Sequence, residues 1–239
     1  MKKYLFLLVF FITVSNLLFG QQQIVLDENA EPVTISAAFN AIEVSDGIHV
    51  FLSQSNSISM AASGKTAGCG KAIKTSISDS VLNISFQNIP GCAYQRSTAN
   101  AYISFLNLKD IRITNGSQVT LVGNVKGEML NVKVQSGSSF KGDVSLNQLN
   151  LNLSNGSDAK INGKAAKVNI EASNASDVMG YGLVADTCHA VASGASDIFI
   201  TAKAELKASA SGASDILYKG NAILINKHSS GSSTIRKKD

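Results

Sequence analysis

The sequence contains no tryptophan, only two prolines, and three cysteines among its 239 residues, and aromatic residues make up 6% of it. So few aromatic rings weigh against a sugar-binding site built on ring stacking. The chain is rich instead in Gly, Ser, Asn, Ala and β-branched residues. This composition is typical of closely stacked β-structure.

The chain also lacks a large excess of either positive or negative charge. The chain has 21 basic and 17 acidic residues. Residues 1–20 hold two of the lysines, so the remainder has 19 basic against 17 acidic residues, a net charge near +2. A charge this small gives no reason to expect nucleic acid or an anionic membrane surface as a partner.

The first twenty residues predict a secretory signal peptide. Lys2 and Lys3 precede an apolar run over residues 4–19, and the polar residues 21–23 follow. Leu18 is larger than the small residue usually found three positions before a cut after Gly20, so an uncleaved membrane anchor is the alternative, although the run is short against the about 20 residues of a bilayer span. No cysteine follows the run, which argues against a lipid anchor. We expect an exported protein, periplasmic, at the cell surface or secreted, with no membrane span after signal removal.

Three cysteines in an exported chain indicate one disulfide and one free thiol. Cys69 and Cys92 both lie beside glycines in turn-like stretches, which predicts a disulfide between them.

A short phrase of small residues recurs seven times in the C-terminal half. Its shared serines are separated by 21, 19, 19, 20, 18 and 18 residues, and they are Ser117, Ser138, Ser157, Ser176, Ser196, Ser214 and Ser232. A period near 19 predicts a solenoid, in which each coil buries its apolar face only by stacking on its neighbours.

Apolar and other residues alternate strictly before each phrase, as in Leu149, Leu151 and Leu153. Period-2 alternation predicts a half-buried strand in every coil. A second short strand follows the phrase, and a third segment that often begins with glycine, such as Gly163, closes the coil. Like strands of successive coils run parallel, and crossovers are right-handed. The fold class is therefore all-β: a right-handed parallel β-helix, a single-stranded β-solenoid with a period of about 19 residues.

The predicted organisation has three parts: the signal peptide, an irregular β-rich part over 21–110 that carries the disulfide, and regular coils over 111–239 with a polar C-terminal cap. Cys188 falls in the inward column and is expected to be a buried small apolar residue rather than a reactive thiol. In the last coil, strict register would turn Leu224, Asn226 and His228 inward, so either the register slips there or the coil is degenerate.

Four aspartates, Asp158, Asp177, Asp197 and Asp215, are predicted to align along one edge of successive coils. One hypothesis is a calcium site, because carboxylates suit a hard cation. The other is that each carboxylate bonds the backbone of its own corner. Neighbouring carboxylates about 4.8 Å apart in water repel by only about 0.9 kcal/mol, comparable with one hydrogen bond, so no metal is needed. We expect no metal and no cofactor.

Catalytic chemistry needs a local cluster of acid, base and charge-stabilising groups. The three histidines, His49, His189 and His228, are widely separated and are expected at the surface, with His189 facing outward. Tyr94 and Arg96 form the one aromatic and basic grouping in an irregular loop, and they are the candidate binding loop. We therefore expect that the protein is not an enzyme.

Three stretches resemble a known family: residues 39–52, residues 101–113, and the Ser-Gly-Ala-Ser-Asp turns at 193–197 and 211–215. Together they are similar to the family called putative auto-transporter adhesin, head GIN domain, found on exported proteins of Bacteroidetes-type bacteria. The resemblance covers about residues 36–236 and implies a β-solenoid at the cell envelope, with no catalytic motif to carry over.

Two classes of function compete. One is a non-enzymatic binding or adhesion module whose solenoid faces meet a protein or a glycan at the envelope. The other is a structural or assembly component with no small ligand. A polysaccharide-active β-helix enzyme is a third, weaker alternative.

Overall fold

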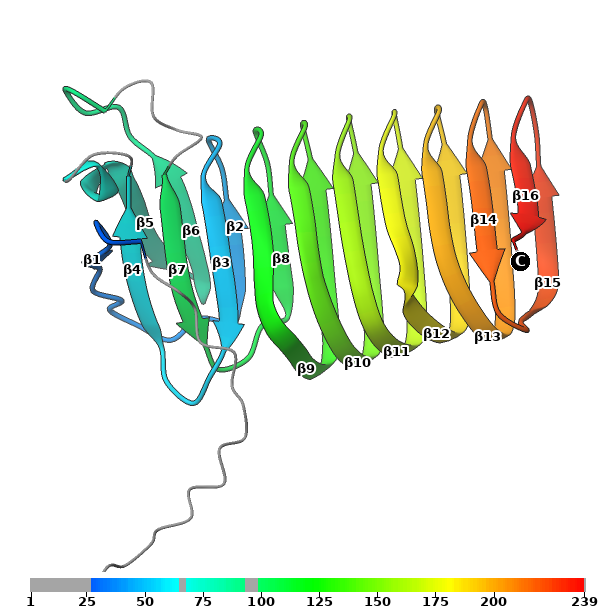
Figure 1. Cartoon of the computed structure of the whole chain (residues 1–239), viewed down its shortest axis with the longest axis horizontal. Helices are drawn as coiled ribbons and strands as arrows, with labels where there is room; N and C mark the ends of the chain where they lie inside the picture. Colours follow the sequence, from blue (N-terminus) through cyan, green and yellow to red (C-terminus); the bar gives the residue numbers. More distant parts are fainter. Residues whose placement is uncertain (1–26, 65–67, 93–98, 239) are drawn as a thin grey trace, which may run out of the picture.

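The structure, a computed structural model, describes residues 27–64, 68–92 and 99–238. Figure 1 shows a row of flattened coils, each with two walls joined by a tight turn at one edge and by a bend at the other. Long parallel strands pair in register from coil to coil, as Asp158 does with Asp177 across β11 and β12. The predicted all-β solenoid with stacked coils of about 19 residues is thereby confirmed.

The strands are, in chain order, β1 (Glu31–Pro32), β2 (Ala41–Val44), β3 (His49–Gln54), β4 (Ser59–Ser63), β5 (Ile73–Ser78), β6 (Val81–Phe86), β7 (Asn100–Phe105), β8 (Asp110–Ile113), β9 (Gln118–Gln135), β10 (Ser139–Ser154), β11 (Asp158–Ser173), β12 (Asp177–Ser193), β13 (Asp197–Ser211), β14 (Asp215–Lys219), β15 (Ile223–Ser229) and β16 (Thr234–Lys237). A short 3-10 helix, η1 (Cys69–Ala72), precedes β5.

We call the two walls A and B. Wall A contains β1, β4, β7, β3, the first parts of β9 to β13, β14 and β16, whereas wall B contains β5, β6, β2, β8, the last parts of β9 to β13, and β15. Each of the strands β9 to β13 therefore runs through a whole coil. The expectation of separate second and third segments was wrong, because the chain bends between the walls without leaving the extended conformation.

The core lies between the walls, where inward residues stack in columns one coil apart. One wall B column holds Leu149, Val168, Cys188 and Leu206, and none of these side chains is more than 4% exposed. Burying a side chain of this size contributes roughly 1.5–3 kcal/mol. Since every coil repeats the arrangement, stability comes from stacking neighbours rather than from one central cluster.

The turn between walls B and A needs an unusual backbone. Both central residues of the turn have positive φ in several coils, for example Asn155 at 60° and Gly156 at 69°. These are the values that a type I′ turn requires, and Asn-Gly is the pair that adopts them most readily. The serine that follows the turn is buried in six of the seven phrases and exposed only at Ser232, and Ser176 Oγ accepts the backbone N–H of Ser157 at 3.2 Å. The recurring phrase is therefore a turn followed by a hydrogen-bonding serine.

The N-terminal end differs from a plain stack of coils. Strands β2 and β3 pair in parallel with β8 and β9, as the coils do. By contrast, β4 is antiparallel to β7 and β1, and β5 is antiparallel to β6. The β5–β6 hairpin turns at Asp79 and Ser80, whose φ values are 51° and 62°. These antiparallel strands were not part of the expectation of an irregular β-rich part over residues 21–110.

The last wall B strand also departs from the repeat. Its pairing with β13 shifts between Leu206 and Lys207, so that Lys227, not Asn226, lies opposite Ala208. Of the two alternatives for the last coil, the register slips. The shift keeps Leu224 packed against the core while Asn226 and His228 are exposed.

Candidate functional site

A shallow groove runs along the outer face of wall B, across the strands. It consists of three adjoining hollows of about 540, 220 and 380 Å³. The first lies over β8 to β12 and the second shares Asn169 and His189 with it, while the third continues from His189 and Lys207 to β15. We call this continuous feature the wall B groove.

The alternation of the strands explains why this groove is polar. Residues that alternate with the buried column face outward, and in-register stacking brings equivalent residues to about 4.8 Å from one another. The central outward row consists of Asp110, Asn131, Asn150, Asn169, His189 and Lys207. A partner lying along the solenoid would therefore meet one polar side chain per coil.

The first four members of that row form a chain of hydrogen bonds. Asn131 Nδ2 donates to Asp110 Oδ1 at 3.0 Å, Asn150 donates to Asn131 at 2.7 Å, and Asn169 donates to Asn150 at 2.7 Å. We call these residues the amide ladder. Each asparagine amide has two N–H donors and one oxygen with two lone pairs, so Asn131 and Asn169 keep unused donors and acceptors, whereas Asn150 also accepts from Gln148 Nε2 at 3.0 Å and donates to Met129 Sδ at 3.7 Å.

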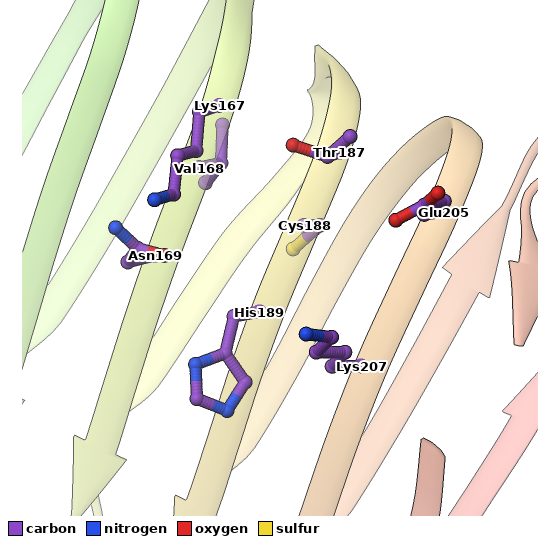
Figure 2. A pocket seen from close by; sticks show the side chains of 8 residues that line it. All are labelled: Lys167, Val168, Asn169, Thr187, Cys188, His189, Glu205 and Lys207. Carbon is purple, nitrogen blue, oxygen red and sulfur yellow. The ribbon is translucent and has the colours of Figure 1, made fainter. Parts of the chain in front are cut away.

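Charges of both signs flank the row. Arg112, Lys133 and Glu171 line one side of the first hollow, and Arg112 Nη1 lies 4.0 Å from Glu43 Oε2. Figure 2 shows the second hollow, where the His189 ring lies between Asn169 and Lys207. The groove therefore offers amide, imidazole, ammonium and carboxylate groups, which suits a polar polymer better than an apolar ligand.

The predicted aspartate row is present on wall A. Asp158, Asp177, Asp197 and Asp215 pair in one register position of successive coils. Asp177 Oδ1 accepts the N–H of Asp197 at 3.1 Å, and Asp197 Oδ1 accepts that of Asp215 at 3.1 Å. The expectation that each carboxylate bonds its own corner was wrong, because stacking places the N–H of the next coil beside it.

Burial, with the charge of Asp177 as a second cause, raises the pKa of Asp158. Burial also raises the pKa of Asp197, and the neighbouring aspartate charges add to the shift. Within the described ranges, no three His, Cys, Asp or Glu side chains come together to hold a metal ion.

The three histidines do not form one site. His189 and His228 are exposed on wall B, as expected, but His49 is only half-exposed on wall A. The His49 ring lies 4.1 Å from that of Phe51, its Nε2 lies 2.9 Å from Thr120 Oγ1, and burial lowers its pKa. His49 therefore faces outward on wall A but is partly covered by its neighbours.

The remaining predicted residues fall in different places. A disulfide joins Cys69 of η1 to Cys92, with Cα atoms 5.8 Å apart, and it forms a small buried cluster with Ala72. The candidate binding loop residues Tyr94 and Arg96 lie outside the described residues. Along the residues that the structure does describe, no helix is both long and apolar enough to cross a membrane.

Sequence reasoning missed the amide ladder. Asn131, Asn150 and Asn169 stand at outward positions of the alternation, and their spacing of 19 residues is the repeat period. The recurrence of asparagine at the same outward position of three successive repeats is the signal that indicates the ladder.

The chain belongs to the family described as putative auto-transporter adhesin, head GIN domain, which it matches over residues 38–222. This confirms the resemblance found in the sequence. Comparison with curated proteins found no match.

Solved structures share the fold. A putative adhesin from Bacteroides fragilis is 18% identical with a TM-score of 0.76, and the match covers 87% of this chain and 96% of that one. A putative adhesin from Parabacteroides merdae is 17% identical with a TM-score of 0.65, covering 88% and 95%. A protein from Parabacteroides distasonis described as a putative lipid binding protein is 15% identical with a TM-score of 0.63, covering 88% and 96%.

Proposed function

We propose that this chain is a non-enzymatic binding module of the cell envelope that holds an extended protein or glycan segment in the wall B groove. The observation that carries the proposal is the amide ladder at the centre of a groove that continues over successive coils. Membership of an adhesin family supports a surface-binding role. Residues 1–20 would direct export, and the protein would act in the periplasm, at the cell surface or after secretion.

The ladder favours an extended partner for a geometric reason. Its amides repeat at the coil spacing of about 4.8 Å, so a chain lying along the solenoid can form similar hydrogen bonds in several coils. Each bond adds only about 1 kcal/mol. Useful affinity therefore depends on contacts repeated over several coils, which a compact ligand could not make.

The test begins with the exported protein on a glycan array and in pull-downs from envelope fractions. For any ligand found, Asn150→Leu and Asn169→Leu together should weaken binding by about tenfold or more, since about 1 kcal/mol per lost bond amounts to that change. The matched control is Lys141→Glu, an exposed substitution on wall A, which should leave the affinity unchanged.

Loss of binding in the Lys141→Glu variant, with full binding in the asparagine variants, would contradict the assignment of the groove. Failure to bind any glycan or envelope protein would favour the alternative of a structural or assembly component. Turnover of a bound polysaccharide would point to the enzyme alternative.

A further inference from the structure

An exposed methionine lies at the margin of the amide ladder. Of the four methionines in the sequence, Met1 belongs to the predicted signal peptide and Met60 is only 5% exposed. Met129 on wall B and Met179 on wall A are 45% and 49% exposed. Met129 lies opposite Gln148 of β10, and its Sδ accepts a hydrogen bond from Asn150 Nδ2 at 3.7 Å. Met179 lies on the opposite wall and is therefore a natural control for the chemistry of Met129.

Asn150 is the member of the amide ladder whose four bonds differ most in strength. Its Nδ2 donates to Asn131 at 2.7 Å, and its Oδ1 accepts from Asn169 at 2.7 Å and from Gln148 at 3.0 Å. The bond to Met129 is the weakest of the four, because a thioether sulfur is a poor acceptor. The N–H that points at this sulfur is thus the donor of Asn150 that an oxygen of a bound partner can take over most easily.

We propose that Met129 is a reversible oxidation site that controls this donor and thereby the affinity of the wall B groove, an inference that rests on the proposed function. The oxidant is hydrogen peroxide. A lone pair of Sδ attacks one peroxide oxygen and the O–O bond breaks. That oxygen stays on sulfur as a sulfoxide, and its proton passes to the leaving hydroxide, which departs as water. The sulfur is oxidised, the peroxide is reduced, and methionine sulfoxide reductases reverse the modification.

The sulfoxide changes the hydrogen bonding of Asn150. Its oxygen is a stronger acceptor than the thioether, and it is attached to an atom that already lies 3.7 Å from Asn150 Nδ2. Rotation of the flexible methionine side chain brings this oxygen to the about 2.9 Å of an ordinary N–H···O bond. Asn150 lines the first hollow, whereas Met129 lies beside it. A partner in that hollow therefore loses one donor when Met129 is oxidised, and the groove binds more weakly.

The first test needs no binding partner. The exported protein with Met179→Leu, in which Met129 is the exposed methionine that remains, is treated with hydrogen peroxide, and peptide mass spectrometry locates the sulfoxide. The side-chain amide signals of Asn150 in NMR spectra should shift downfield and exchange more slowly with solvent, and methionine sulfoxide reductase should restore them.

The matched control for this test is Met129→Leu with Met179 kept. Leucine replaces methionine at nearly the same volume, so both variants should fold as the parent does. Peroxide oxidises Met179 in the control, and the Asn150 signals should not respond. Unchanged Asn150 signals after oxidation of Met129, or the same change in the control, would overturn the proposal.

The second test measures the consequence for binding, with isolated envelopes of the producing bacterium as the probe. Peroxide treatment should weaken the binding of the Met179→Leu protein to the envelopes about fivefold, the effect of one lost hydrogen bond, and leave that of Met129→Leu unchanged. Absence of binding before oxidation would overturn the proposed function and its control by oxidation together. Undiminished binding after oxidation of Met129 would overturn the control alone.

Discussion

The reactivity of the Cys188 thiol is determined by its position in the inward column of wall B. It is 4% exposed between Val168 and Leu206, and burial raises the pKa of its thiol to about 12. The thiolate is the reactive form, so a water-soluble thiol reagent at pH 8 should label native Cys188 only as fast as the protein unfolds. Cys188→Asp should cost more than about 2 kcal/mol, because it buries an unpaired charge, whereas Cys188→Ala should cost less. Labelling of the native protein within seconds would contradict this burial.

Substitutions of Asp197 can separate the effect of a hydrogen bond on stability from the effect of a charge. Its folded-state pKa is raised above the ordinary 3.8, mainly by burial. Protonation of the Asp197 carboxyl therefore contributes stability that is fully present below pH 3.8 and is lost as pH rises through the folded-state pKa. Asp197→Asn keeps an acceptor oxygen and removes the charge, so it should match the parent near pH 3 and be more stable at pH 7. Asp197→Ala, which has no acceptor, should be about 1 kcal/mol less stable than Asp197→Asn at both pH values.

Denaturant unfolding of the three proteins at pH 3, 5 and 7 measures these differences. Millimolar calcium should leave the melting temperature of the parent protein unchanged, because the carboxylates of Asp177, Asp197 and Asp215 already accept backbone N–H groups of the next coil. A rise of more than about 5 °C with calcium, abolished in Asp197→Asn, would instead assign the aspartate row to a metal site.

At the scale of the element, the turns between the walls differ in how well their residues tolerate a positive φ. Ala175 has a φ of 59°, a conformation that suits glycine, whereas the equivalent residue one coil earlier is Gly156 at 69°. Ala175→Gly should raise the free energy of unfolding by about 1 kcal/mol and Gly156→Ala should lower it by a similar amount. Chemical denaturation of the two variants checks this pair. Shifts of the same sign would show that something other than the turn backbone decides stability there.

The elements that could be predicted from sequence are those set by local pattern. The alternation around Leu149 and the regular spacing of the turns define the strands, the inward columns and the period without any tertiary information. The antiparallel strand β4 could not be predicted, because its pairing with β7 depends on contacts distant in sequence. For the last coil, the sequence showed only that strict register would turn Asn226 and His228 inward. The pattern could not say whether the register slips or the coil is degenerate, and the structure shows the slip between Leu206 and Lys207.

The candidate site was less predictable than the fold. A groove is a property of neighbouring coils, and the amide ladder depends on hydrogen bonds between Asn131, Asn150 and Asn169 that form only when the coils stack. The repeat period is enough to assign residues to outward columns. Which of these columns lines a groove can be seen only in the folded surface.

At the scale of the whole molecule, the fold should tolerate loss of one complete coil. Deleting residues 158–176 joins Ser157 directly to Asp177 and keeps every column, because Ser139 then meets Asp177 where it met Asp158. Since each coil contacts only its neighbours, the shortened protein should fold cooperatively with a lower melting temperature and a length reduced by about 4.8 Å, measured by circular dichroism and small-angle scattering. Deleting only residues 158–166 removes the wall A part of one coil, which puts a wall B strand directly after the turn, and this control should not fold. If both deletions unfold the protein equally, stability would not reside in neighbouring coils, and the molecule would instead behave as one indivisible core.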